Sequence, residues 1–121
     1  MAESVLSDWL LAALRAAIPE GSTIPTLAEG NPNRVTAIEP EGVWVETIRS
    51  ETAGTGAQLV EAWMIQAAWD HLERHGTITN SLVLNEMNIK RSSAVCALLA
   101  RLPEVRLTSS RAPIELTLTR H

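Results

Sequence analysis

The sequence predicts an α+β fold, on the basis of three observations. In several segments apolar side chains recur every three or four residues, which is the spacing of a helix that buries one face. Two other segments alternate apolar and polar side chains around a turn signal, which indicates β-hairpins. The 121 residues are 45% apolar but include no Phe and no Tyr, so Leu, Val, Ile and Ala must fill most of the core. This length and composition suit one domain with a buried core.

The first half of the chain is predicted to contain one helix and one hairpin. The helix covers residues 4–18, with Ser4 or Ser7 as its N-cap. Its apolar face is so wide that it needs cover on more than one side, from the rest of the domain or from a second copy. The following segments are interpreted as a loop at 22–33, a hairpin at 34–47 with its turn at Glu39–Gly42, and a connector at 50–57.

The second half is predicted to hold three helices, a bridging strand and a hairpin. In order, these are a helix at 58–75 capped by Gly76, a strand at 77–79, a short helix that Thr79, Asn80 or Ser81 caps, a helix up to Leu102, and hairpin arms at 105–108 and 114–119. This order is that of a winged helix-turn-helix. We therefore expect one compact domain with an N-terminal helix (1–21), a β-hairpin extension (22–49) and a winged helix (57–121).

The charge is distributed unevenly along the chain. Its net value is −4, which argues against a protein that coats nucleic acid without specificity. Residues 1–60 hold three arginines and eight acidic residues, a net charge of −5, whereas residues 87–121 hold six cations and two acids, a net charge of +4. A polyanion would therefore be met by the C-terminal third.

The start of the third helix of the winged-helix unit is the candidate DNA contact. Arg91 is expected to pair with guanine, while Lys90, Ser92 and Ser93 hold backbone phosphates. Further contacts are expected from cations and hydroxyls on or near the wing and before the first hairpin: Arg101, Arg106, Ser110, Arg111 and Arg34. The alternative is that Ser92 or Ser93 only caps the helix and the two cations are solvated.

The outward face of the same helix is unusual for a helix that reads bases. It continues through small residues, Cys96, Ala97 and Ala100, and has no Asn, Gln or Arg at its middle. Small side chains permit a close approach to a DNA groove, or packing against another element such as the first helix. If that face is covered, the DNA interpretation weakens. A covered third helix together with an exposed stripe of Leu6, Trp9 and Leu10 favours a protein-interaction or dimerisation module instead.

Residues 24–118 resemble a winged-helix module of prokaryotic modification-dependent restriction endonucleases of the HNH, McrA-like type. The resemblance rests on "GNPNRVTAIEPEGVWVET" and on "KRSSAVCALLARLPEV". It implies double-stranded DNA as the partner and target recognition for a nuclease, with a modified base among the candidate targets. This chain has no nuclease motif, so we expect either a region of a longer polypeptide that carries the nuclease domain or a stand-alone relative of such modules. A transcription regulator is the nearest alternative function.

Other residues offer less. Trp9, Trp63 and Trp69 lie in helical apolar patterns and are expected in the core, while Trp44 either stacks on a base or, as we favour, packs on the first helix. His71 and His75 have the spacing of a metal pair but no third ligand. We expect no enzyme activity, no cofactor and no metal.

The chain is expected in the prokaryotic cytoplasm. Its single cysteine excludes an internal disulfide and a cysteine metal site. No apolar stretch approaches the roughly 18 residues that cross a bilayer, and Glu3 and Asp8 stand where a signal peptide would carry positive charge.

Overall fold

The computed structural model describes residues 5–25, 27, 32–47, 56–109 and 114–119. These residues form an α+β fold of four helices and two antiparallel sheets. The elements in chain order are α1 (Asp8–Ala17), β1 (Thr23–Pro25), β2 (Pro32–Glu39), β3 (Gly42–Thr47), β4 (Gln58–Glu61), α3 (Ala62–His75), β5 (Thr77–Thr79), α4 (Asn80–Asn85), α5 (Ser92–Leu99), β6 (Val105–Ser109) and β7 (Glu115–Leu118).

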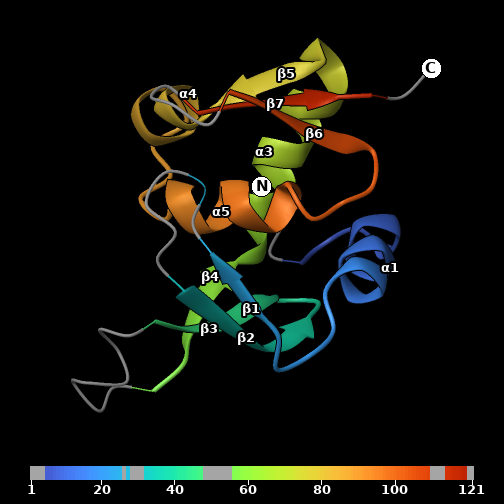
Figure 1. Ribbon diagram of the computed structural model, residues 1–121, viewed down its shortest axis with the longest axis vertical. Coiled ribbons are helices and arrows are strands. Elements are labelled where there is room, and N and C mark those ends of the chain that lie inside the picture. Colours follow the sequence, from blue (N-terminus) through green and yellow to red (C-terminus); the bar gives the residue numbers. More distant parts are fainter. Residues whose placement is uncertain (1–4, 26, 28–31, 48–55, 110–113, 120–121) are drawn as a thin grey trace.

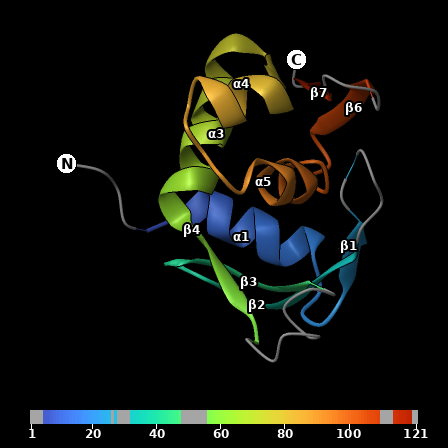
Figure 2. The same cartoon turned by 90° about the vertical axis from the view of Figure 1, so that its left-hand side faces the viewer.

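The two sheets lie at opposite ends of the molecule, with α5 between them (Figure 1). One sheet has the strand order β1-β2-β3-β4 and the other has the order β5-β7-β6. Figure 2 shows that α1 and α5 both lie on the same side of the four-stranded sheet. The buried side chains of all these elements belong to one core cluster, which includes Leu10 and Leu14 from α1 and Leu116 from β7.

The predicted hairpin at 34–47 is confirmed, and the structure extends it on both sides. Val35 pairs with Val45 and Ile38 with Val43, with a bulge between Val35 and Ala37. The segment read as a loop contains the short strand β1, which pairs with β2. The prediction of helix from residue 58 is wrong for its first turn, because residues 58–61 pair with β3 as β4 and the helix begins only at Ala62.

The β2–β3 turn is held from two sides. The Pro40 carbonyl accepts a hydrogen bond from the Leu6 amide (2.7 Å), and the Glu41 carbonyl accepts one from the Ala62 amide (2.8 Å). Gly42 follows with a φ of +145°, and a Cβ there would overlap the Val60 carbonyl oxygen. The turn therefore fixes how α1 and α3 meet the sheet.

The helix ends follow the predicted caps. Ser7 accepts a hydrogen bond from the Leu10 amide (3.3 Å) at the start of α1, and Thr79 accepts one from the Leu82 amide (3.1 Å) at the start of α4. Gly76 ends α3 in the left-handed conformation, with its amide bonded to the Leu72 carbonyl. Each of these groups satisfies backbone atoms that a helix end leaves without a partner.

The tryptophans differ from the prediction. Trp69 is buried as expected, but Trp9 is 49% exposed and Trp63 is 36% exposed. Both lie at the edge of their helix's apolar face, where one side of the indole meets solvent. Trp44 is half-buried between the buried Val43 and Val45, and alternation along β3 directs it to the opposite face of the sheet, outside the core cluster. The favoured packing of Trp44 on the first helix is therefore wrong.

Candidate functional site

The four residues predicted to contact DNA at the start of α5 do not form one exposed surface. Lys90 and Ser93 are exposed, but Ser92 is only 4% exposed and Arg91 is half-buried. The Arg91 guanidinium donates a hydrogen bond from Nη2 to Oε1 of Gln58 on β4 (2.9 Å). Arg91 is also the N-cap of α5, without a side-chain capping bond, so neither serine acts as the cap.

Most of the outward face of α5 is covered. Cys96 and Ala97 are each 2% exposed and Ala100 is half-buried, and burial raises the pKa of the Cys96 thiol to about 12. The Cys96 thiol lies 4.0 Å from Oδ1 of Asn80 at the start of α4, and strand β1 also contacts α5. A helix enters the major groove of DNA with an exposed face, and α5 offers only Ser93 as a fully exposed residue.

The remaining predicted contacts are dispersed. Arg101 and Arg106 are exposed, on the segment after α5 and on β6. Arg34 is exposed on β2, in the sheet at the other end of the molecule, and lies 3.8 Å from the Glu46 carboxylate. Ser110 and Arg111 lie outside the described residues. Among the described cations, the structure therefore does not bring Arg34 and Arg106 together.

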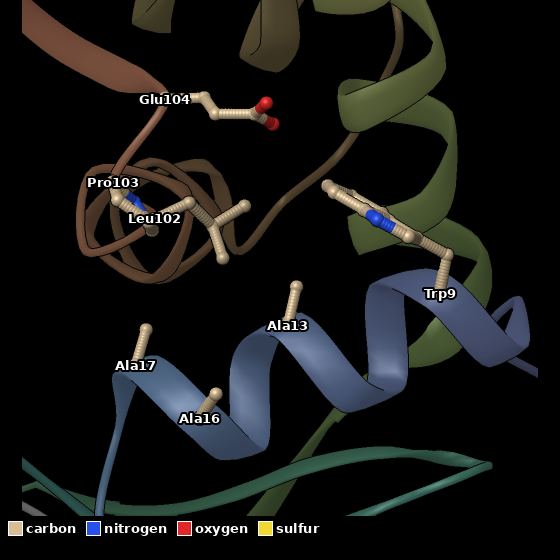
Figure 3. Close-up of a pocket in the computed structure, with 7 residues that line it drawn as sticks. All are labelled: Trp9, Ala13, Ala16, Ala17, Leu102, Pro103 and Glu104. Carbon is tan, nitrogen blue, oxygen red and sulfur yellow. The ribbon is translucent and has the colours of Figure 1, made fainter.

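An apolar groove lies between α1 and the segment that follows α5. Its volume is about 310 Å³, and Figure 3 shows the side chains that line it: Trp9, Ala13, Ala16, Ala17, Leu102, Pro103 and Glu104. Helix α1 contributes one wall made of alanines, with Trp9 at one end. Sequence reasoning missed this groove because its two walls are some 90 positions apart, although the wide apolar face of the first helix was a signal.

The indole of Trp9 is held in place by a second indole. Its ring stacks on Trp69 with a centroid distance of 5.0 Å and an interplanar angle of 26°. Trp69 is almost completely buried, so it gives Trp9 a rigid support while about half of Trp9 stays in solvent. A large aromatic side chain that is both exposed and fixed is typical of binding hot spots.

Acidic residues line the groove and a second hollow. Asp8 directly precedes Trp9 in the sequence, and Asp70 directly follows Trp69. Both aspartates help to line a second hollow of about 430 Å³. The Asp70 carboxylate accepts a hydrogen bond from the Gln66 amide (2.9 Å). Glu104 extends its carboxylate along the rim of the apolar groove (Figure 3). The arginine of α1, Arg15, is engaged elsewhere and donates to the Ile38 carbonyl on β2 (3.0 Å).

His71 and His75 form the other cluster of polar side chains of interest. Their rings lie 4.4 Å apart, centroid to centroid, on the last turns of α3. The pKa of His71 is lowered, first by burial and then by the positive charges of His75 and Arg74, while Glu86 acts in the opposite direction. The described part of the chain contains no group of three His, Cys, Asp or Glu side chains that could hold a metal ion.

Comparisons with known proteins give no further guidance. The sequence matches no family model, and no curated protein and no solved structure is significantly similar to it. Among the described helices, none is long and apolar enough to cross a bilayer.

Proposed function

We propose that this chain is a winged-helix protein-interaction domain, whose groove beside Trp9 binds a basic amphipathic helix of a partner protein. The order α3, β5, α4, α5, β6, β7 and the strand order β5-β7-β6 support the winged-helix assignment. The buried face of α5 is the observation that turns the proposal from DNA towards protein. The sequence favoured a protein partner under two conditions, a covered α5 and an exposed stripe of Leu6, Trp9 and Leu10. The structure meets the first, but of the stripe only Trp9 is exposed, because Leu6 and Leu10 are buried in the core.

The shape of the groove favours a helix as the occupant. An amphipathic helix binds by placing apolar side chains at positions i, i+3, i+4 and i+7 into a groove. The alanines of α1 let such a helix approach closely, and Leu102 and Pro103 form the facing wall. Among the described residues that line the groove, Glu104 is the only titratable one, so they offer few polar groups to orient a small ligand.

The charge of the rim favours a basic occupant. The Glu104 carboxylate lies on the rim of the groove, and Asp8 and Asp70, the sequence neighbours of Trp9 and Trp69, line a second hollow. Two described cations adjoin lining residues in the sequence: Arg15, which donates to the Ile38 carbonyl, and the exposed Arg101. Complementary charges at the rim of an interface increase the rate of association and select between partners. Lysines or arginines on either side of the apolar anchors would therefore distinguish the partner helix.

Trp9 would be a hot spot of the interface. A Trp side chain buries up to about 250 Å², so covering its exposed half removes roughly 100 Å² from water. At about 25 cal/mol per Å² this corresponds to about 2–3 kcal/mol. Loss of the indole should therefore weaken binding by roughly 30- to 150-fold.

A selection with helical peptides tests the proposal. A displayed library of amphipathic peptides would be selected on the full chain, and the enriched peptides measured by fluorescence anisotropy against variants. We expect the enriched peptides to have basic flanks and to bind the Trp9→Ala and Ala16→Lys variants more weakly than the wild type. Ala16→Lys places a cation in the groove. Ala12→Lys is the matched control, because Ala12 is an exposed residue of α1 that does not line the groove.

Equal binding to the Ala16→Lys and Ala12→Lys variants would contradict the proposal, as would a failure to enrich any basic amphipathic peptide. Circular dichroism of each variant would establish that α1 is still folded. The same proteins would be tested on duplex DNA, because that result decides the second candidate.

The second candidate is binding to double-stranded DNA, as the target-recognition part of a restriction nuclease. The specific observation that favours it is the exposure of Lys90, Arg101 and Arg106 within the basic C-terminal third. It is tested with plain and methylated duplexes over a range of salt concentrations. Binding that weakens with salt and is lost in the double variant Lys90→Ala/Arg106→Ala would establish DNA as a partner. It would also refute the proposal that the chain binds only protein.

A further inference from the structure

We propose that His71 and His75 chelate a divalent transition-metal ion on the surface of α3, with water in the remaining coordination positions. The two residues are four positions apart on one helix, so their side chains lie on the same face one turn from each other. Imidazole nitrogen is a ligand of choice for Cu²⁺, Ni²⁺ and Zn²⁺. This inference is independent of the proposed partner helix.

The separation of the rings fits one coordination geometry better than another. A metal–nitrogen bond of about 2.1 Å places the ion about 3.2 Å from each ring centre. Two such ligands at 90° then have their ring centres about 4.5 Å apart, and at the tetrahedral angle about 5.2 Å apart. The observed centroid distance is 4.4 Å. The distance between the ring centres is therefore closer to that of neighbouring ligands of a square-planar or octahedral ion, the geometries that Cu²⁺ and Ni²⁺ prefer, than to that of tetrahedral Zn²⁺ ligands.

The pair is accessible, and charged side chains of both signs lie near it. Arg74 lies between the two histidines and opposes a cation, whereas the Glu86 carboxylate, at the end of α4, attracts one. Both rings are accessible, since His71 is half-buried and His75 is exposed.

Calorimetric titration of the full chain with NiCl₂, CuSO₄ and ZnCl₂, in a buffer that does not bind metal, tests the proposal. We expect one strong site for Cu²⁺ and Ni²⁺, weakened at least about tenfold by His71→Gln or His75→Gln, because one imidazole alone loses the chelate advantage. For Cu²⁺, electron paramagnetic resonance should show coupling to two nitrogens, reduced to one in either variant.

A rearranged pair is the matched control. The double variant Glu73→His/His75→Glu keeps the composition and net charge but puts the histidines two positions apart, on different faces of the helix. It should bind Cu²⁺ and Ni²⁺ more weakly than the wild type, because a carboxylate replaces the second imidazole of the pair. Because His121 is present in every variant, it contributes equally to all. Affinity that is the same in the wild type and the rearranged variant would overturn the proposal, and tighter binding of Zn²⁺ than of Ni²⁺ would overturn the geometric assignment.

Discussion

Replacing Gly42 with alanine should destabilise the fold more than any other glycine-to-alanine change among the described glycines. The new Cβ would overlap the Val60 carbonyl oxygen and come within 3.1 Å of the Ala62 amide nitrogen, which are both backbone atoms. The turn cannot shift freely, because its neighbours Pro40 and Glu41 are hydrogen-bonded to two other segments. The clash must therefore be relieved by separating β3 from β4.

The magnitude follows from two contributions. A left-handed conformation costs a residue with a Cβ about 1–2 kcal/mol, and overpacking of a tightly packed site adds about 1–3 kcal/mol. Gly42→Ala should thus lower the free energy of unfolding by about 2–5 kcal/mol, a large part of the 5–15 kcal/mol that is ordinary for a domain. The corresponding fall in Tm is roughly 8–20 °C. Urea titration and thermal unfolding followed by circular dichroism measure both quantities.

Gly76→Ala separates the two contributions. Gly76 also has a positive φ, of +84°, but a Cβ there would meet nothing within 4 Å. It should cost only the conformational part, about 1–2 kcal/mol. If Gly42→Ala is no more destabilising than Gly76→Ala, the close approach of β4 to the turn is not rigid and the reasoning fails.

Two further predictions concern titrating groups. The Cys96 thiol is buried and its pKa is raised to about 12. In the native protein at about pH 8 it should not react with a thiol reagent, whereas in denaturant it should react fully. Rapid reaction without denaturant would show that α5 is accessible. In the folded protein the pKa of His71 lies below its ordinary value of 6.5. As the pH falls, His71 therefore takes up a proton in the unfolded chain at a higher pH than in the folded protein. The free energy of unfolding should thus decrease as the pH drops from about 6.5 towards the pKa of His71 in the folded protein. His71→Gln should reduce this fall in Tm between about pH 8 and pH 5, and an unchanged profile would contradict the assignment.

The elements that the sequence predicted well are those with strong local signals. The hairpin at 34–47 has a period of two and a turn signal, and Gly76 and Thr79 mark helix ends by the chemistry of their own residues. Strands β1 and β4 were missed because three or four residues carry little periodicity. They are strands because a neighbouring strand offers them hydrogen bonds, as when Val60 pairs with Val43.

The candidate site depended on contacts between distant segments. The groove needs α1 and residues 102–104 to meet, and no local pattern specifies that meeting. The alanines of α1 have the same spacing whether they face a core or an open groove. The small size of Cys96 and Ala97 made a covered helix face one of two predicted alternatives. Only the packing of the whole chain decides between a covered and an open face.

The central place of β7 in its sheet has a consequence for synthesis. This strand is the last described element, yet β5 and β6 pair only with it and not with each other. While the chain emerges from the ribosome, both strands therefore lack partners: the buried Ile78 pairs with Leu116 and the buried Val105 pairs with Leu118, so neither has its partner until β7 has been made. Contacts between segments so far apart in sequence form slowly. We expect the nascent chain to expose apolar surface up to that point, so that ribosome-bound chains stalled before residue 115 would be sensitive to protease and those stalled well beyond it would be resistant.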